Sequence, residues 1–259
     1  MIEMNTPIWR YLSFFKFFDW VASRKMYFAR ADQFKDDRWE CVIPDVILLK
    51  RLELLKESGF DAERIHRIRN QYDVTNPLRR SHSFVSSWFR AENESDLMWR
   101  ANCGQHPGIA VKSTPQLIKE SLADDQQHSA FVKVDEVAYY NPDAVGADLD
   151  LMEKMLCAPI LSKRDAFAGD QECRFFIEWN EIQTKGDEAW VATPEKCLRV
   201  ECNTKACFNE IVLSPGVEKS SLEVIKDFVE GYGIDPAVVR LSKIDEQFDQ
   251  LIDRNALQN

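Results

Sequence analysis

The sequence is poor in the two residues that most often interrupt regular structure, with 9 Gly and 10 Pro among 259 residues. It also has no Pro/Gly/Ser-rich linker, charge block or internal repeat. Because compact domains are usually joined by such linkers, we expect one domain over residues 1–259. Its motif-bearing core would span about 9–216, followed by a C-terminal helix–strand–helix at 217–259.

Basic residues are not in excess, and long apolar runs are missing. The 33 Lys and Arg against 43 Asp and Glu give a net charge of −10, which argues against an extended nucleic-acid surface. The aromatic N-terminal segment is interrupted by Glu3, Arg10, Lys16 and Asp19 before it reaches the length of a signal peptide or a membrane helix. We therefore expect a cytoplasmic protein without a membrane segment.

A CxxC pair is also missing, although the chain has 7 cysteines. An odd number without such a pair is typical of free thiols in a reducing compartment. Cys197, Cys202 and Cys207 recur every five residues, and this spacing matches no common zinc site. These cysteines are therefore not expected to form a metal centre.

What is present is a pattern of short strands and helices in irregular order, which predicts an α+β fold. Strands are expected at residues 9–12, 26–29, 83–89, 108–112, 131–140, 172–179, 198–201, 209–213 and 238–241. Helices are expected at residues 15–22, 45–55, from 61, 93–101, 115–122, 149–156, 220–229 and 244–252. These elements predict a single domain with a mixed or antiparallel sheet covered by helices.

The clearest stretch is Arg79–Lys112, which reads as strand, acidic corner, helix and strand. Asn93 is the expected N-cap of the helix, and Gly104 its expected end. The apolar stripe of this helix would consist of Leu97, Met98 and Ala101. In the later strand from Glu172, alternation would put Cys173, Phe175 and Ile177 on one side and Glu172, Arg174 and Glu178 on the other.

Four motifs in a fixed order suggest a family. They are Trp9-Arg-Tyr11; Phe28-Ala-Arg30-Ala-Asp32-x-Phe34 with Asp37-x-Trp39-Glu40; Trp88-x3-Glu92-x-Glu94-Ser95-x2-Met98-Trp99 with Gly108-Ile-Ala-Val; and Lys163-Arg164-x2-Phe167 with Asp170-x-Glu172-x-Arg174. Together they resemble the bacterial family described as domain of unknown function 2971 (DUF2971). The chain departs from the family pattern at Arg38, Phe89 and Asp170, where proline, histidine and glutamate are expected. The resemblance implies one α+β domain and no established activity.

The order of these elements is also similar to the R-S-E arrangement of ADP-ribosyltransferases, which implies a fold of that kind and NAD as the candidate substrate. Arg10 would pair with the dinucleotide phosphates, and serines of the strand at 83–89 would support the nicotinamide ribose. Glu172 would bind a ribose hydroxyl and stabilise an oxocarbenium-like transition state. Aromatic side chains would stack on a ring of the ligand.

These considerations predict one shared polar site. Its catalytic residues would be Glu172 and Asp170, and its cofactor-binding residues Arg10, Tyr11, Arg30, Ser83, Ser86 and Trp88. Its further polar members would be Asp32, Glu40, Glu94, Ser95, Trp99, Lys163, Arg164 and Arg174. Side chains of Arg10, Arg30, Glu94 and Glu172 should then line one cleft.

Two other functions fit the same residues. The first is a non-catalytic module that binds a nucleotide or a protein partner through a polar network. The second is a metal-dependent phosphoesterase with phosphate held by Lys163 and Arg164. Its oxygen ligands would be Asp32, Asp36, Asp37 and Glu40.

Overall fold

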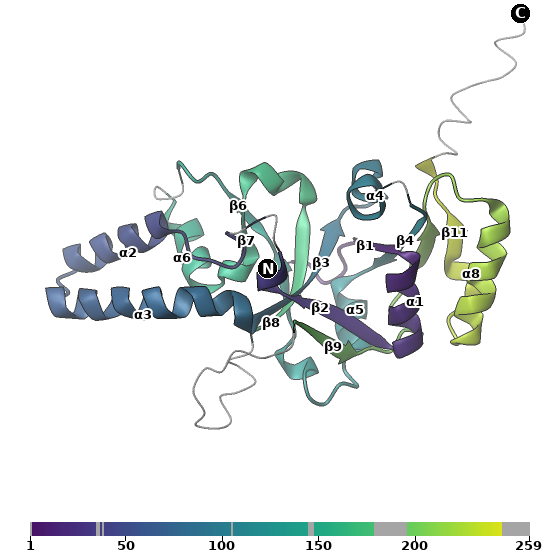
Figure 1. Ribbon diagram of the computed structural model, residues 1–259, viewed down its shortest axis with the longest axis horizontal. Coiled ribbons are helices and arrows are strands. Elements are labelled where there is room, and N and C mark those ends of the chain that lie inside the picture. Colours follow the sequence, from purple (N-terminus) through teal and green to yellow (C-terminus); the bar gives the residue numbers. More distant parts are fainter. Residues whose placement is uncertain are drawn as a thin grey trace, which may run out of the picture. The chain divides into compact units, whose positions relative to one another are not determined.

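The computed structural model of the protein describes residues 2–34, 37, 39–104, 106–144, 148–178 and 196–244 (Figure 1). The described chain has an α+β fold with a mixed sheet, as predicted. It separates into two compact units, each assembled from distant segments. Unit 1 comprises Met1–Ile2, Tyr27–Ser87 and Phe131–Arg199, and unit 2 comprises Glu3–Met26, Trp88–Ala130 and Val200–Asn259. That the chain forms one domain stays a prediction.

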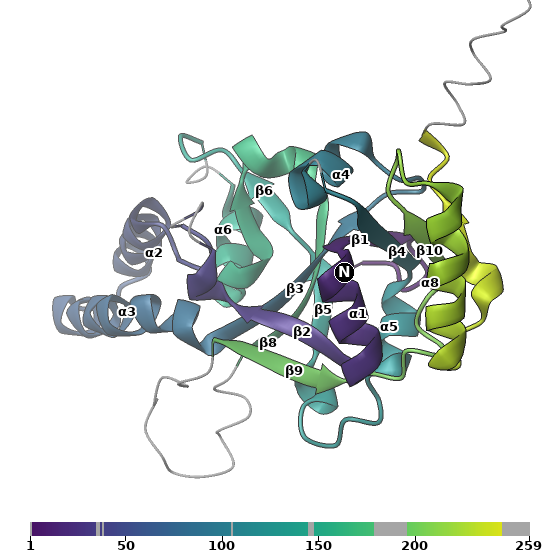
Figure 2. The same ribbon diagram turned by 45° about the vertical axis from the view of Figure 1, so that its right-hand side comes forward.

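The sheet of unit 2 contains strands β1 (Ile8–Ser13), β4 (Gly108–Ser113), β10 (Glu210–Leu213) and β11 (Val239–Leu241) (Figure 2). Antiparallel pairing joins β1 to β4 and β4 to β10, whereas β10 and β11 are parallel. The end of β3 (Ser83–Arg90) pairs antiparallel with β1 at Trp9 and Phe89. Unit 2 is therefore built on a mixed sheet.

Helices α1 (Phe14–Ser23), α4 (Asp96–Cys103), α5 (Pro115–Ser121) and α8 (Lys219–Gly231) belong to the same unit. Neighbouring residues of a strand point to opposite faces of a sheet, so the side chains on β1 identify the face that each helix covers.

Trp9 and Tyr11 share a buried cluster with Trp99 of α4. The intervening Arg10 instead lies over Trp20 of α1, with 5.6 Å between the guanidinium carbon and the ring centroid. Helices α4 and α1 thus cover opposite faces of β1.

Unit 1 contains residues 27–30 of β2 (Lys25–Arg30), residues 83–87 of β3, β5 (Lys133–Glu136) and β8 (Glu172–Glu178). β8 pairs with both β3 and β5. The antiparallel pairs include Ala29 with Val85 and Val134 with Phe175.

Two shorter strands, β6 (Ala138–Tyr140) and β7 (Ser162–Arg164), form a separate parallel pair. The strand β9 (Cys197–Glu201) begins in unit 1 and ends in unit 2.

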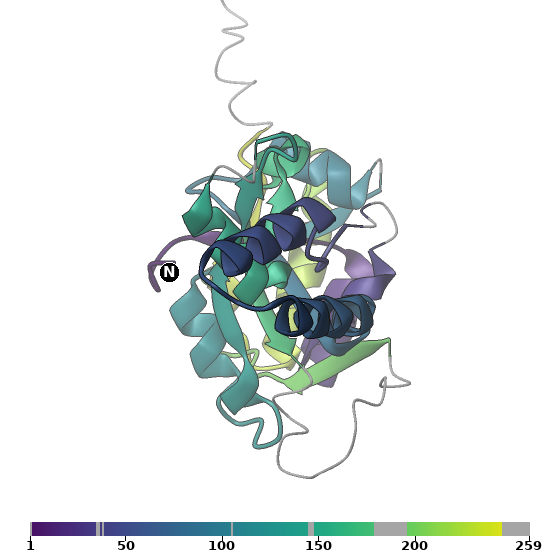
Figure 3. The same ribbon diagram turned by 90° about the vertical axis from the view of Figure 1, so that its left-hand side faces the viewer.

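Three helices of unit 1 are α2 (Asp45–Glu57), α3 (Ala62–His82) and α6 (Leu149–Cys157), and α2 lies beside α3 (Figure 3). Ile43 and Ile47 pack with Met152 and Met155 of α6 in one buried cluster. Short 3₁₀ turns η1 (Ala31–Gln33), η4 (Pro159–Leu161) and η5 (Asp165–Asp170) adjoin β2, β7 and β8. Further 3₁₀ turns are η2 (Ser129–Phe131) and η6 (Pro236–Val238).

Some predicted helix starts are confirmed and others are wrong. Asp61 caps α3 by accepting a bond from the Arg64 amide, and Thr114 caps α5. The N-cap of α4 is Ser95 instead of Asn93, because the Ser95 hydroxyl accepts from Met98 N and its own amide donates to Tyr11. The helix predicted to start at Ser220 begins one residue earlier, at Lys219, and the Ser220 hydroxyl bonds the Glu218 carboxylate instead of capping the helix.

Burial corrects several predicted faces. Leu97 is 63% exposed, and α4 instead buries Trp99 and Cys103. Phe15 of α1 is 87% exposed, while Phe17, Trp20 and Val21 are buried. The predicted Met98 does pack against the buried cluster of α4, and Val21 is buried in α1, so each buried face overlaps the predicted one only in part.

Two strand predictions also change. The predicted strand 131–140 is divided into β5 and β6, and β7 was missed because it has only three residues. Glu172 and Arg174 share a side of this strand, as alternation predicted, and Arg174 is 1% exposed. Trp179 of the predicted strand and residues 245–252 of the predicted closing helix lie outside the described residues.

Gly108 allows β4 to approach its neighbours closely. A Cβ built at this position would lie 2.8 Å from the Leu12 carbonyl oxygen and would overlap the Cys103 sulfur. None of the helices that the structure describes combines the length and the apolar character needed to span a bilayer.

Candidate functional site

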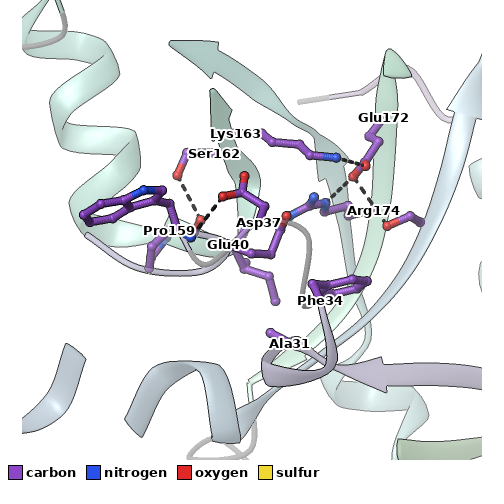
Figure 4. Close-up of polar contacts among 12 residues, drawn as sticks. Ala31, Phe34, Asp37, Glu40, Pro159, Ser162, Lys163, Glu172 and Arg174 are labelled. Carbon is purple, nitrogen blue, oxygen red and sulfur yellow. Dashed lines mark hydrogen bonds and ion pairs between the residues drawn. The ribbon is translucent and has the colours of Figure 1, made fainter. Parts of the chain in front are cut away.

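The best-defined polar cluster in unit 1 surrounds Glu172, the first residue of β8. Its Oε1 accepts a 2.7 Å bond from Lys163 Nζ, and its Oε2 accepts a 2.6 Å bond from Arg174 Nε (Figure 4). Ser87 of β3 donates to the same Oε2 at 3.4 Å. One carboxylate therefore binds two cations and a serine hydroxyl from a neighbouring strand.

Local structure sets this geometry. Residues two apart on a strand share a face, so Glu172 and Arg174 project from β8 together. Lys163 comes from β7, whose partner β6 provides the Tyr139 hydroxyl that accepts a 2.8 Å bond from the Glu172 amide. The turn η5 brings Asp170 to within 2.7 Å of Lys163 Nζ. Side chains from β3, β7 and β8 thus meet at the Glu172 carboxylate, while β6 and η5 bind its amide and the lysine beside it.

The cluster has a buried end and an accessible end. Arg174 is 1% exposed, and it forms an ion pair with Glu40 and donates a 2.5 Å bond to the Ile160 carbonyl. At the other end the side chains of Glu172 and Asp170 are 12% and 38% exposed. Because a ligand can reach only the accessible end, we assign the Arg174–Glu40 pair to the stability of the unit and the Asp170–Glu172 end to any chemistry.

Electrostatics keep this cluster ionised. Burial alone would raise the pKa of Glu172, but the charges of Arg174 and Lys163 outweigh burial and lower this pKa to about 2. Burial likewise opposes the charge of Lys163, yet Glu172 and Asp170 hold the pKa of Lys163 above its ordinary value. Burial raises the pKa of Tyr139 to about 12. Glu172 is therefore a hydrogen-bond acceptor, and no proton is available from it near neutral pH.

The turn η1, which follows β2, carries a second set of polar contacts in unit 1. Arg30 pairs with both carboxylate oxygens of Asp32, at 2.8 Å each. Burial works to raise the pKa of Asp32, but hydrogen bonds from Arg30 and Gln33 lower it overall. Arg80 of α3 donates a 3.0 Å bond to the Phe34 carbonyl, which ties this turn to α3.

Eight of the predicted site residues therefore belong to the polar contacts of unit 1, and they are Arg30, Asp32, Glu40, Lys163, Arg164, Asp170, Glu172 and Arg174. Ser83 and Ser86 are also in unit 1, on β3, and are 5% and 1% exposed.

The acids proposed as metal ligands are paired with arginines. Asp32 binds Arg30, Asp37 lies 3.2 Å from Arg164, and Glu40 pairs with Arg174. Asp36 lies outside the described residues. Within the part of the chain that the structure describes, no three His, Cys, Asp or Glu side chains gather in a metal-binding arrangement.

Glu94 and its neighbours form a different polar cluster, in unit 2. The Glu94 carboxylate is 6% exposed and accepts bonds from Ser242 Oγ at 2.7 Å and from the Lys243 amide at 2.7 Å. Arg240 and Trp99 donate to it at 3.3 and 3.1 Å. The contacts of Glu94 therefore join the start of α4 to the segment after β11.

The predicted ring-stacking residues are part of the core of unit 2. Tyr11, Trp88 and Trp99 are 5%, 1% and 4% exposed. Tyr11 meets Trp99 edge to face, with 4.9 Å between ring centroids, and burial raises the pKa of Tyr11. Arg10 lies over Trp20 and Trp88. These rings pack against protein, and their role in ligand binding stays a prediction.

Sequence reasoning missed several members of both clusters. Tyr139 lies in a segment that was predicted only as a strand, and Arg80 was not among the predicted site residues. The partners of Glu94 at residues 240–243 are about 150 positions away, and no local pattern connects them.

In comparisons with protein-family models, with curated proteins and with solved structures, no match to this chain was found. The resemblances to DUF2971 and to the ADP-ribosyltransferase arrangement stay predictions.

Proposed function

We propose that the protein is an ADP-ribosyltransferase-like enzyme that uses NAD, with the accessible end of the Glu172 cluster as its ribose-binding part. The observation that carries this proposal is the contact between Ser87 on β3 and Glu172 on β8, at 3.4 Å. A serine-bearing strand beside a catalytic glutamate is what the R-S-E similarity implies. Lys163 and Asp170 extend the same polar surface.

In this proposal the ionised Glu172 accepts a hydrogen bond from a ribose hydroxyl of NAD. The bond between ribose C1′ and the nicotinamide nitrogen breaks, and nicotinamide leaves as a neutral ring that keeps the bonding electron pair. Positive charge then develops on the ribose, and the fixed negative charge of Glu172 stabilises it. A nucleophile of the acceptor attacks C1′ and releases its proton to solvent.

A second candidate, binding without turnover, is favoured by the saturation of Glu172. Each of its oxygens already accepts a bond from a cation, at 2.7 and 2.6 Å. A cluster that is satisfied before any ligand arrives serves well as a rigid binding wall. The two candidates differ in whether nicotinamide is released.

The test is incubation of the purified full chain with NAD, followed by chromatographic measurement of nicotinamide and by melting temperature with and without NAD. The enzyme hypothesis expects both protection by NAD and nicotinamide release. Glu172→Gln should reduce release by about 100-fold or more, because it removes a charge aimed at the developing cation.

Glu40→Gln is the matched control. Glu40 pairs with the same Arg174 but is 3% exposed and lies at the buried end. This variant should lose stability while the folded fraction still releases nicotinamide. Protection by NAD without nicotinamide release would support the binding module instead, and absence of both would refute the enzyme hypothesis and exclude NAD as the ligand of a binding module.

A further inference from the structure

A hollow of about 490 Å³ lies in unit 2, where the end of α1 meets the segment after β9. It is lined by Arg24 and Lys25, which follow α1, by residues 201–205, and by Asp124 of the turn after α5. Small-molecule sites usually have volumes of about 300–1,000 Å³, so the hollow is large enough for such a ligand. It shares no residue with the Glu172 cluster.

The lining of the hollow is hydrophilic. Among the described residues that line it, none is aromatic or large and aliphatic, and all except Cys202 carry a charge, a hydroxyl or an amide in the side chain. A nucleotide base or a lipid chain would therefore find no ring or apolar side chain to pack against. The lining fits a small, strongly hydrated ligand.

Cations outnumber carboxylates in this lining. Arg24, Lys25 and Lys205 line the hollow together with Asp124 and Glu201, in a chain whose net charge is −10. Within the part of the chain that the structure describes, none of the three cations forms an ion pair, whereas lysines on α2 and α8 pair with glutamates at 2.7 and 3.0 Å. Positive charge without a partner, gathered in a hollow, attracts an anion.

Lys205 is held in position by its surroundings. Its amide donates a 3.2 Å bond to Asn203 Oδ1, and the Asn203 amide donates a 2.7 Å bond to the Ser121 carbonyl. The lysine side chain lies against Gly233, since a Cβ built on this glycine would be 2.8 Å from Lys205 Cε. The missing side chain at Gly233 thus leaves the space that Lys205 occupies.

Arg24 stands at a position that favours glycine. It is the C-cap of α1 and has a left-handed backbone, with φ 53° and ψ 38°. Glycine adopts this conformation without the steric cost of a Cβ. The Arg24 carbonyl accepts a 2.8 Å bond from the Cys202 amide, which fixes the corner between α1 and the segment after β9.

Two hydroxyl groups at the hollow have no hydrogen-bond partner. Thr204 is 1% exposed, and neither its Oγ1 nor the Oγ of Ser23 forms a hydrogen bond to any described residue. A buried hydroxyl without a partner costs free energy and needs an explanation. A ligand in the hollow supplies one.

We propose that this hollow binds a phosphate ester of a small polyhydroxylated molecule, such as a sugar phosphate. The cations pair with the phosphate oxygens, and the hydroxyls of Ser23 and Thr204, turned by rotation about χ1, donate to the same oxygens. Asp124 and Glu201 accept bonds from hydroxyl groups of the ligand. Because the lining offers acceptors as well as cations, the ester should bind more tightly than inorganic phosphate.

The test is isothermal titration calorimetry of the purified full chain at low ionic strength with glucose 6-phosphate, glycerol 3-phosphate, inorganic phosphate and glucose. At least one ester should bind with a Kd of about 1 mM or tighter. Inorganic phosphate should bind about tenfold more weakly, and glucose should show no binding. The proposal is overturned if neither ester binds, if glucose binds as tightly as the esters, or if inorganic phosphate does.

Lys205→Met tests the cations, because it keeps a long side chain against Gly233 and removes the charge. It should weaken binding of the ester by about tenfold or more. Lys226→Met is the matched control, since Lys226 lies in the same unit but pairs with Glu223 on α8. It should bind as the wild type does, and equal effects of the two changes would contradict the proposal.

Arg24→Gly and Thr204→Val separate binding from stability. Each should weaken binding of the ester without lowering the melting temperature. The first relieves a left-handed backbone, and the second removes a buried hydroxyl that has no partner among the described residues. A lower melting temperature with unchanged binding would show that these residues serve only the fold and would overturn the assignment.

Discussion

At the scale of single residues, the ion pairs of the Glu172 cluster both stabilise the fold and keep Glu172 ionised. Arg174 is 1% exposed and compensates two carboxylates, those of Glu172 and Glu40. Leaving a buried charge without its partner typically costs about 3–5 kcal/mol, so the pairing explains why so polar a group is tolerated in the interior. The same residues set the protonation state of Glu172, which any catalytic role needs.

The pH dependence of stability follows from Glu172. Its folded pKa, about 2, lies below its ordinary value of 4.5, so ionised Glu172 stabilises the fold above pH 4.5 and this contribution is lost as pH falls towards 2. We expect the difference in urea midpoint between wild type and Glu172→Gln to be largest near pH 7 and to shrink across this window.

Glu53→Gln is the control for that titration. Glu53 pairs with Lys50 on the surface of α2 at 2.7 Å, and exposed pairs contribute little to stability. Its urea midpoints should follow the wild type at every pH. A difference for Glu172→Gln that is constant between pH 7 and 3 would contradict the role given to the Glu172 charge.

At the scale of elements, hydrogen bonds to distant residues help to determine where a helix begins. The start of α4 is determined by Ser95, whose amide donates a 2.8 Å bond to Tyr11 of β1. Asn93 is of a residue type that is favoured at N-caps, but it does not make this bond to Tyr11. Local chemistry predicted that a helix starts in this corner, and a strand more than 80 positions earlier selected the residue.

The hydrogen bonds of Glu94 lead to a prediction for α4 and for the segment after β11. Its four partners all donate hydrogen bonds, and Glu94→Gln would turn an amide donor towards them. We expect the free energy of unfolding to fall by about 2–4 kcal/mol, because buried donors lose a charged acceptor. Hydrogen exchange at the Lys243 amide should accelerate, since this amide donates to Glu94 at 2.7 Å.

Glu92→Gln provides the comparison, because Glu92 occupies the same acidic corner with an exposed side chain. It should change stability by less than about 0.5 kcal/mol, as is usual for surface substitutions. Equal effects of the two changes, measured by urea unfolding, would show that Glu94 does not join α4 to the segment after β11.

At the scale of the whole molecule, the chain alternates between two compact units. Each unit takes three separate segments, so no continuous half of the sequence contains a complete unit. Cooperative folding requires most of a unit's core to be present. This arrangement makes truncation a test of the division.

A fragment of residues 1–130 would lack residues 131–199 of unit 1 and residues 200–259 of unit 2. It loses β5 and β8 from one unit and β10 and β11 from the other. We expect no sharp thermal transition by circular dichroism, whereas the full chain should unfold cooperatively. A sharp transition for the fragment would contradict the assignment of the units.

Much of the architecture is encoded locally. Periodicity and caps predicted the α+β class, the start of α3, the bounds of α2, α5 and α6 to within a few residues, and the strands that carry Glu172 and the serines. These features depend on neighbours within about one turn or one strand, which the sequence displays directly. One continuous motif likewise predicted three members of the polar site, Lys163, Glu172 and Arg174.

Tertiary structure alone decided which residues meet. Arg174 pairs with Glu40 and Glu94 with Arg240 across 134 and 146 positions, and nothing in the local sequence indicates such partners. Tyr11, Trp88 and Trp99 look like ligand platforms in the sequence but are buried, because the sheet and helices of unit 2 enclose them. Burial and long-range pairing depend on the packing of all segments together, and it is packing that separates a reactive side chain from a structural one.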